Sequence, residues 1–346
     1  MKFVFCAFLS AALFGAATPL SKALLPYFNA FELAGLLYIG AALGAASVAF
    51  GKQNQTKPWR MDSRNIMRLS GAILFGGVLA PILLLLGLKA ASAASVSLWL
   101  PLELVATAVL GRLLFKDHLG RLGWLGMAGV VVASVLLSSG EGTSGIAAGL
   151  LILLACVCWG FDNNFTALID GITPAQSTFW KGLAAGLTNL AIGLVIYGFN
   201  ATTATLAGAL GVGALSYGAS IVLYITAAQN IGATRGQIFF ASSPFFGVAL
   251  STAILHETIS SLQALAAAIL ILSLILVFMD RHEHSHTHEE LEHEHSHRHD
   301  DGHHRHEHPL GAETGRHSHR HRHEPVVHAH PHWPDLHHRH GHSLAK

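Results

Sequence analysis

A long apolar stretch that occurs twice sets the architecture of this chain. When the sequence is shifted by 140 positions, residues 92–118 fall on a second copy without a gap. Leu110 then falls on Leu250, and the acidic residue that closes the stretch, Asp117, falls on Glu257. Each copy is longer than the roughly 20 apolar residues that a helix needs to cross a bilayer, and far longer than a buried strand. We therefore predict that the membrane part is a duplicated unit.

Other apolar segments extend the duplication. An aromatic residue followed by glycine occurs at 14–15 and again at 159–160, an offset of 145. The apolar segments predict ten membrane helices: about 1–25, 31–50, 70–87, 92–118, 122–137, 149–169, 177–197, 207–229, 236–255 and 262–279. The predicted fold class is all-α, with five-helix repeats at 1–140 and 141–280 and a separate tail at 281–346. Residues 1–17 resemble a cleaved signal peptide, but their counterpart in the second half predicts a retained helix.

An odd number of helices per repeat places the second repeat upside down in the membrane, as in many secondary transporters. Basic residues predict the orientation, because they are enriched in cytoplasmic loops. With a cytoplasmic N terminus, two fall on the outer side (Lys22 and Lys89) and nine on the cytoplasmic side: Lys52, Lys57, Arg60, Arg64, Arg68, Arg112, Lys116, Arg121 and Arg235. We predict an integral membrane protein, expected in the inner membrane, with both termini in the cytoplasm.

Composition separates the membrane part from the tail. The chain is 51% hydrophobic and 12% charged. The tail holds 23 of the 25 histidines. Cys6, Cys156 and Cys158 lie in apolar segments, which argues against a disulfide framework. No nucleophile–base arrangement, phosphate-binding loop or Cys-rich zinc motif is present in the sequence, so we expect neither an enzyme nor a nucleic-acid partner.

The ordered motifs carry a family resemblance. They are the aromatic–glycine pair in the first helix of each half, the Ala-rich entry into each fourth helix, and the acidic residue after it. In this order the motifs resemble the EamA-type members of the drug/metabolite transporter superfamily, over residues 1–280. The resemblance implies ten helices, cytoplasmic termini and movement of small solutes, most often export. This chain departs from the family pattern in the fourth helix of the first half. Members usually have a proline there, where this chain has Leu104, with Pro101 three residues earlier.

Ionisable side chains within the predicted helices are candidate solute-binding groups, because lipid makes them costly. Glu103 is the strongest, since it follows Pro101, whose missing N–H frees a carbonyl for a polar site. Its alternative role is a helix-end residue that reaches water. Asp162 and Asn163 form a polar cluster, either a solute site or a clamp between helices. Lys181 can pair with an acid, bind a solute carboxylate, or reach the membrane interface.

Two further groups of side chains have simple structural alternatives. Glu32 is most simply explained as a carboxylate at a helix start, where it suits the helix dipole. Aromatic residues are candidates for lining a cavity, but they also belt membrane interfaces. The aromatic candidates are Trp99, Tyr217, Tyr224, Phe239 and Phe240.

The tail predicts metal binding. Histidines alternate with other residues, and in an extended chain alternate side chains share a side, so each His-x-His can offer two imidazoles to one ion. The low hydrophobicity predicts a disordered segment that binds Zn, Ni, Co or Cu. A solvated tail and a pH-responsive polycation are the alternatives. The principal candidate ligands are His282, His284, His286, His288, His293, His295, His297, His299, His317, His319, His321 and His323.

These features predict a secondary transporter that exports a small metabolite-like solute by alternating access, with its site near mid-membrane between the halves. Its partners are the bilayer, the solute and a divalent metal at the tail, and no cofactor is required. The alternatives are a divalent transition-metal efflux protein and a membrane-anchored metal buffer or sensor. The membrane part lacks the His or Met cluster that a selective transition-metal site needs, which favours an organic solute. The sequence leaves the solute, coupling ion and oligomeric state open.

Overall fold

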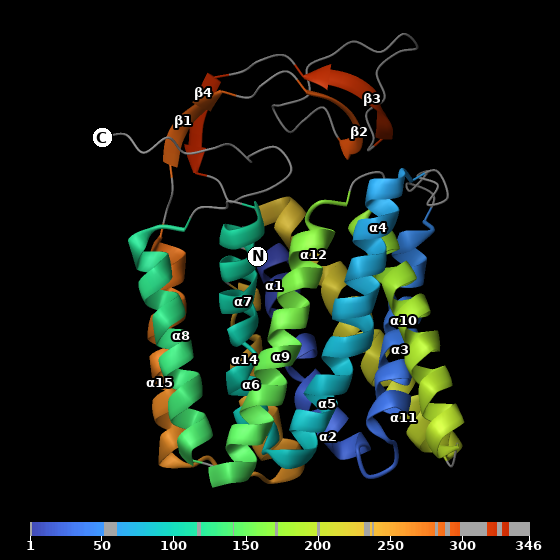
Figure 1. Ribbon diagram of the computed structural model, residues 1–346, viewed down its shortest axis with the longest axis vertical. Helices are drawn as coiled ribbons and strands as arrows, with labels where there is room; N and C mark the ends of the chain where they lie inside the picture. The colour runs from blue at the N-terminus through green and yellow to red at the C-terminus, as the bar shows by residue number, and fades with distance from the viewer. Residues whose placement is uncertain are drawn as a thin grey trace.

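The computed structural model is a bundle of long helices with short strands beyond one end (Figure 1). It describes residues 2–51, 61–115, 119–140, 142–169, 172–198, 201–231, 236, 239–280, 283–287, 291–297, 317–323 and 327–331. The N terminus lies toward the end of the bundle from which α4 begins, and the tail strands lie beyond that same end (Figure 1).

Each half of the membrane part contains a π-helical segment in its third helical span, whereas the first span is divided into two helices in the first half and is one helix in the second. The first half contains α1 (Lys2–Gly15), α2 (Ala17–Leu24), α3 (Ala30–Ala49), α4 (Ser63–Ala72), the π-helical segment η2 (Ile73–Leu79), α5 (Ala80–Ala90), α6 (Ala93–Trp99), α7 (Leu102–Phe115) and α8 (Arg121–Gly140). The second contains α9 (Gly142–Thr166), α10 (Pro174–Tyr197), α11 (Thr203–Val212), the π-helical segment η3 (Gly213–Ala219), α12 (Ser220–Ile231), α14 (Ser243–Leu255) and α15 (Ser261–Met279).

The predicted all-helical membrane class is confirmed. Within the described residues, nine helical stretches are long and apolar enough to cross a membrane, and α14 is a shorter apolar helix. The predicted span 236–255 is thus shorter as a regular helix, because a turn at residues 241–242 precedes α14. Many large apolar side chains are exposed on the outer surface, including Val195 (86%) and Leu113 (72%). A bilayer is the environment in which such a surface is stable.

Two predicted loops are partly helical. The loop predicted over 51–68 ends earlier, because the Asp62 carboxylate accepts the backbone N–H of Asn65 (2.9 Å) and caps α4. The polar linker predicted at 140–145 belongs largely to α9, which starts at Gly142 with φ of +68°. Glycine adopts this left-handed backbone without strain, so one residue is enough to separate α8 from α9.

The two π-helical segments occupy equivalent positions in the halves. η3 begins and ends 140 residues after η2, the same shift that aligns the two fourth helices. A π-helical turn alters the backbone hydrogen bonding and often marks a functional site. In η2, the Gly76 carbonyl accepts hydrogen bonds from the Tyr38 hydroxyl (2.5 Å) and Trp159 Nε1 (3.2 Å). The Gly77 carbonyl accepts one from Asn189 Nδ2 (3.1 Å).

Helix α3 packs closely against α10 and η3 because glycines face these contacts. A Cβ atom added at Gly35 would lie 2.5 Å from the Leu190 backbone nitrogen, and one added at Gly213 would collide with the Leu37 carbonyl. Small residues of this kind let helix backbones approach each other inside a membrane. The contacts join the second helix of the first half to the second and third helical spans of the second half.

The described parts of the tail are four short strands, β1 (Glu283–Thr287), β2 (Leu291–His297), β3 (His317–His323) and β4 (Val327–Pro331). The rest of the tail lies outside the described residues. Strands β1 and β4 pair antiparallel, as do β2 and β3, in a register that places His293 opposite His321, His295 opposite His319 and His297 opposite His317. The two-residue alternation of histidine matches the period of a strand.

Candidate functional site

The fourth helix of each half is broken near its middle. In the first half, α6 ends at Trp99 and α7 begins at Leu102, with Pro101 in the turn between them. In the second half, a turn at 241–242 precedes α14, which has Pro244 in its first turn. Proline lacks a backbone N–H and clashes with the preceding helical turn, so it ends or kinks a helix. Both breaks therefore follow from the proline positions.

The acidic residue that follows the fourth helix of the second half, Glu257, binds the first half at one end of the contact between the halves. The two Glu257 carboxylate oxygens accept the backbone N–H groups of Ala93 and Ala94, each at 2.9 Å, at the start of α6. Gln263 Nε2 donates to the hydroxyls of Ser92 (3.1 Å) and Ser95 (2.9 Å). A carboxylate at a helix N terminus satisfies N–H groups that have no partner inside the helix.

This contact also fixes the relative direction of the two fourth helices. Glu257 follows the end of α14 and contacts the start of α6, whereas a Cβ atom added at Gly247, earlier in α14, would lie 2.5 Å from Ser97 Oγ, later in α6. The two helices therefore run antiparallel, as the predicted inverted repeat requires. The matching acid of the first half, Asp117, lies outside the described residues.

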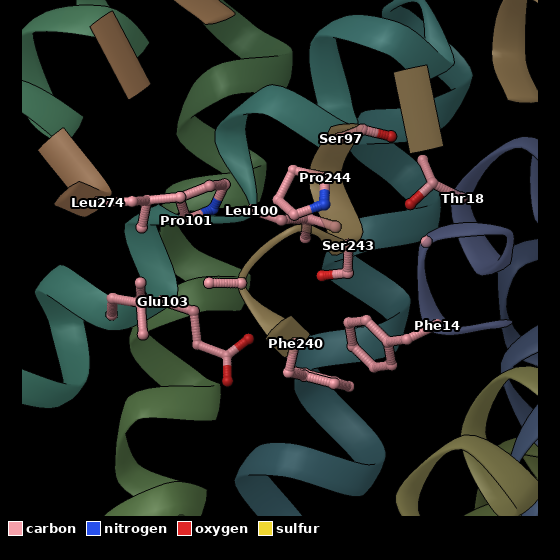
Figure 2. A pocket seen from close by; sticks show the side chains of 13 residues that line it. Phe14, Thr18, Ser97, Leu100, Pro101, Glu103, Phe240, Ser243, Pro244 and Leu274 are labelled. Atoms are coloured by element: carbon pink, nitrogen blue, oxygen red, sulfur yellow. The ribbon is translucent and has the colours of Figure 1, made fainter. Parts of the chain in front are cut away.

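A cavity of about 110 Å³ lies between the two breaks (Figure 2). Eight of its lining residues form four pairs separated by 140 positions: Leu100 and Phe240, Pro101 and Ala241, Glu103 and Ser243, Leu104 and Pro244. The remaining lining residues come from α1, α2, α6 and α15: Phe14, Gly15, Thr18, Ser97 and Leu274. Equivalent segments of the two halves thus face each other across one space.

Glu103 brings a carboxylate to this cavity. It lies in the first turn of α7, where the helix dipole favours negative charge. Its Oε1 atom accepts a hydrogen bond from Asn163 Nδ2 (2.8 Å), and Asn163 Nδ2 also lies 3.1 Å from the Thr107 hydroxyl. Figure 2 shows the carboxylate directed into the space beside Phe240. Asn163 therefore holds Glu103 from behind the cavity wall.

Asp162 and Lys181 form an ion pair between α9 and α10 instead of lining this cavity. Lys181 Nζ lies 2.7 Å from Asp162 Oδ2, with the lysine side chain 20% exposed and the aspartate 5%. The Thr166 hydroxyl donates to Asp162 Oδ1 at 2.9 Å. The Asp162 carboxylate also packs against the η2 backbone at Gly76. Both carboxylate oxygens thus have protein partners, which favours a clamp between helices over a solute site.

The predicted aromatic candidates also divide into residues that line the cavity and residues that pack elsewhere. Trp99 is fully buried and its Nε1 donates to the Ser134 carbonyl (3.1 Å), so it packs inside the bundle. Tyr217 contacts the ring of Phe14 at a centroid distance of 6.0 Å, behind the cavity wall. Phe240 lines the cavity. Of the six predicted solute-binding residues, Glu103 alone is among the residues that line this cavity.

Thr18 and Ser243 line the cavity and escaped the sequence analysis. Both are at least nine-tenths buried. The duplication carried a signal for each, since Ser243 is the counterpart of Glu103 at the offset of 140 and Thr18 that of Asn163 at 145. The missed signal was that two pairs of equivalent positions carry polar side chains in apolar helices. Glu32 caps α3 together with Asn29, as predicted.

The predicted metal ligands of the tail fall partly outside the described residues. His282, His288 and His299 lie outside them altogether. The others belong to β1, β2 and β3, where the backbone is described and side-chain positions are not. Metal binding at the tail therefore stays a prediction.

Replacing Lys181 tests the clamp. Lys181→Met leaves Asp162 buried without its cation, and breaking a buried pair in this way costs about 3–5 kcal/mol. We expect a clear fall in the melting temperature of the detergent-solubilised protein. The double variant Asp162→Asn/Lys181→Met should recover much of that loss because no lone charge remains. Lys89→Met, at an exposed lysine, is the control. A Lys181→Met protein as stable as the control would show that the pair is not a clamp.

Comparisons with known proteins agree with the helical architecture. The model of the EamA-like transporter family matches residues 1–139 and 146–279. A protein of Methanothermobacter thermautotrophicus named an uncharacterized transporter is 27% identical over 61% of this chain and 64% of its own length. A Synechocystis protein with a similar name is 28% identical over 74% of this chain and 83% of its own length.

Two further comparisons concern localisation and fold. The Escherichia coli K12 protein named uncharacterized inner membrane transporter YedA is 29% identical over 48% of this chain and 57% of its own length. A solved structure that covers 80% of this chain and 96% of its own has a TM-score of 0.54 at 19% identity, which shows a shared fold alone. With its family model matched twice along the membrane part, the chain belongs to the EamA-like transporter family and is an integral membrane protein.

Proposed function

We propose that this transporter exports a small metabolite-like solute by alternating access, and that the solute binds in the cavity between α7 and α14. The observation that carries the proposal is the Glu103 carboxylate, directed into a cavity whose walls come from equivalent residues of both halves. A buried charge in a membrane is costly, so its place at a cavity supports a role in solute binding. Broken helices in transporters also mark solute sites, because backbone groups without helical hydrogen bonds are tolerated in a membrane only where they face protein or a cavity.

The contact between the halves supports alternating access. Glu257 and Gln263 join the second half to the start of α6, so the bundle is held together at that end of the cavity. Opening that end requires these hydrogen bonds to be lost. The cavity itself can stay in place between the interruptions of the two fourth helices. Relative movement of two halves around a fixed site is how transporters with inverted repeats work.

The orientation is part of the proposal. The N terminus and the tail strands lie toward the same end of the bundle (Figure 1). Basic residues of the predicted cytoplasmic loops, such as Arg64 and Arg68, lie in α4 at that end. Placing this end in the cytoplasm follows the positive-inside rule, and it places the end held by Glu257 on the outer side. Export then begins with solute entering from the cytoplasm.

A second proposed activity is binding of a divalent transition metal by the tail. The register of β2 and β3 supports it, because three histidines of β2 lie opposite three of β3. The register thus brings six histidines into opposite positions along two paired strands, and imidazole suits Zn, Ni, Co and Cu. We assign the metal to the tail and the organic solute to the membrane cavity.

Replacing Glu103 tests the solute site. In Glu103→Gln the amide oxygen can still accept the Asn163 hydrogen bond, so the fold is kept while the charge is lost. Hydrogen bonds to a charged group are worth about 1.5–3 kcal/mol, so we expect at least about a tenfold loss of flux for any solute that the charge holds. Flux is measured in proteoliposomes with a panel of amines, amino acids, carboxylates, sugars and the ions Ni²⁺, Co²⁺ and Zn²⁺.

The matched control is Glu32→Gln, because glutamine also forms the capping box at the start of α3. This variant should keep both the melting temperature and the flux. Flux of the Glu103→Gln protein equal to that of the wild type would remove Glu103 from the site. A panel in which Ni²⁺, Co²⁺ or Zn²⁺ alone is transported would favour the metal-efflux alternative.

Deleting residues 282–346 tests the separation of tail and cavity. The truncated protein should lose most of its Zn²⁺ and Ni²⁺ binding, measured by equilibrium dialysis, and should keep its melting temperature and solute flux. The reason is that the cavity is lined by residues between Phe14 and Leu274. Undiminished metal binding after truncation would contradict the tail assignment, and loss of all solute flux would make the tail part of the transport mechanism.

A further inference from the structure

We propose that the cavity between the fourth-helix breaks selects solutes that carry a protonated amine on a small apolar body. This inference rests on the proposed function, because it names the solute class for the same site. It is carried by three features of the cavity: a carboxylate, two buried hydroxyls and facing aromatic rings. None of these features follows from the family alone.

The polar groups of the cavity suit a hydrogen-bond donor. One oxygen of Glu103 is held by Asn163, and among the described residues its Oε2 atom has no partner. Within the same part of the chain, the hydroxyls of Thr18 (3% exposed) and Ser243 (8% exposed) have no hydrogen-bond partner. Figure 2 shows the Ser243 hydroxyl and the Glu103 carboxylate directed toward one space, with Thr18 on its far side.

Neither hydroxyl is among the fully enclosed polar atoms without a partner in the described residues, so both oxygens stay open to the cavity, where they can bond a polar ligand. An ammonium group has three donors and no acceptor. It can therefore donate to Glu103 and Ser243, whose polar groups face one space in Figure 2, and the carboxylate makes one of these bonds charge-assisted. A neutral alcohol has one donor, so it can satisfy only one of these two acceptors.

The net charge near the cavity also selects a cation. In the part of the chain that the structure describes, the one ion pair is Asp162–Lys181, whose charges cancel. Lys22 Nζ is bound to the carbonyl oxygens of Leu88 and Ala91. The Glu103 charge is thus left without a protein cation in contact with it. A solute carboxylate would be repelled there, whereas a protonated amine supplies the missing positive charge.

The apolar residues that line the cavity determine the size and polarity of the rest of the solute. The rings of Phe14 and Phe240 lie 5.1 Å apart between centroids, at 48° to each other. Aromatic faces attract a nearby cation and also pack against alkyl groups. Leu100 and Leu274 complete an apolar wall. The cavity volume of about 110 Å³ is somewhat below the ~150 Å³ of a cavity that holds benzene, so the body should be a short alkyl group.

The test compares three probes that share one short alkyl body: propylamine, 1-propanol and butanoate. At pH 7.5 the amine is protonated, because alkyl amines such as the lysine side chain have a pKa of about 10.4. Binding to the full-length protein in detergent is measured by titration calorimetry. We expect the amine to bind at least about tenfold more tightly than the alcohol, a factor that corresponds to 1.4 kcal/mol, and the carboxylate to bind more weakly still.

Four variants locate the binding. Glu103→Gln should weaken binding of the amine at least about tenfold and change binding of the alcohol little. Ser243→Ala should weaken amine binding several-fold, and Glu32→Gln should leave it unchanged. Glu103→Asp, which keeps the charge on a shorter side chain, should bind the amine more tightly than Glu103→Gln does. Melting temperatures confirm that each variant is folded.

Several results would overturn the inference. They are equal affinity for the amine and the alcohol, tighter binding of the carboxylate, no binding of the amine, or amine binding that survives Glu103→Gln in a folded protein. The proposed function fails differently: its failure is an absence of flux for every solute of the panel. Flux of carboxylates without amine binding would overturn the amine inference and leave the transporter proposal standing.

Discussion

The need to satisfy every backbone polar group inside a membrane determines the centre of this structure. Lipid offers no hydrogen bonds, so a helix broken at mid-membrane is stable only where it faces protein or a cavity. Pro101 and Pro244 break the two fourth helices, and the breaks face each other across one cavity. The carboxylate and the hydroxyls gather at that cavity because it is a place within the membrane where polar groups need not meet lipid.

The contact between the halves gives a physical meaning to the acidic residue that ends the repeated stretch. Glu257 lies just beyond its own helix, and it binds the N–H groups at the start of the equivalent helix in the other half. One side chain therefore satisfies two backbone donors and also ties the halves together. Because the helices run antiparallel, this contact lies at one end of the cavity. The same bonds that stabilise this conformation have to break if that end opens.

The sequence predicted the helices well because their apolar length and the repeat are independent signals of the same elements. It also singled out Glu103, an acid two residues after a proline in an apolar helix, and the structure places this side chain in the cavity lining, while its role in solute binding stays a prediction. It could not decide between the roles of Asp162, Lys181 and Trp99. Their roles depend on helix rotation, which determines whether Lys181 reaches Asp162 and whether Trp99 faces Ser134 or a cavity.

Other departures from the predictions have local causes. Helix α9 starts at Gly142, two residues after the end of α8, which shortens the predicted linker, and the Asp62 cap extends α4 into a predicted loop. Thr18 was missed because a single threonine in an apolar helix usually bonds its own backbone. Its role emerges only when the cavity brings it near Ser243, which is distant in sequence.

The account depends most on the claim that the cavity is a path for solute and is reached from water. The direct measurement is the reaction of Ser243→Cys, in a protein whose natural cysteines are replaced, with a membrane-impermeant thiol reagent in proteoliposomes. Leu272→Cys, at a lipid-facing position that is 59% exposed, is the control. The account predicts that Cys at 243 reacts, that a transported solute slows the reaction, and that Cys at 272 stays unmodified. Absence of reaction at 243 from both sides of the membrane, in a folded protein that transports, would contradict it.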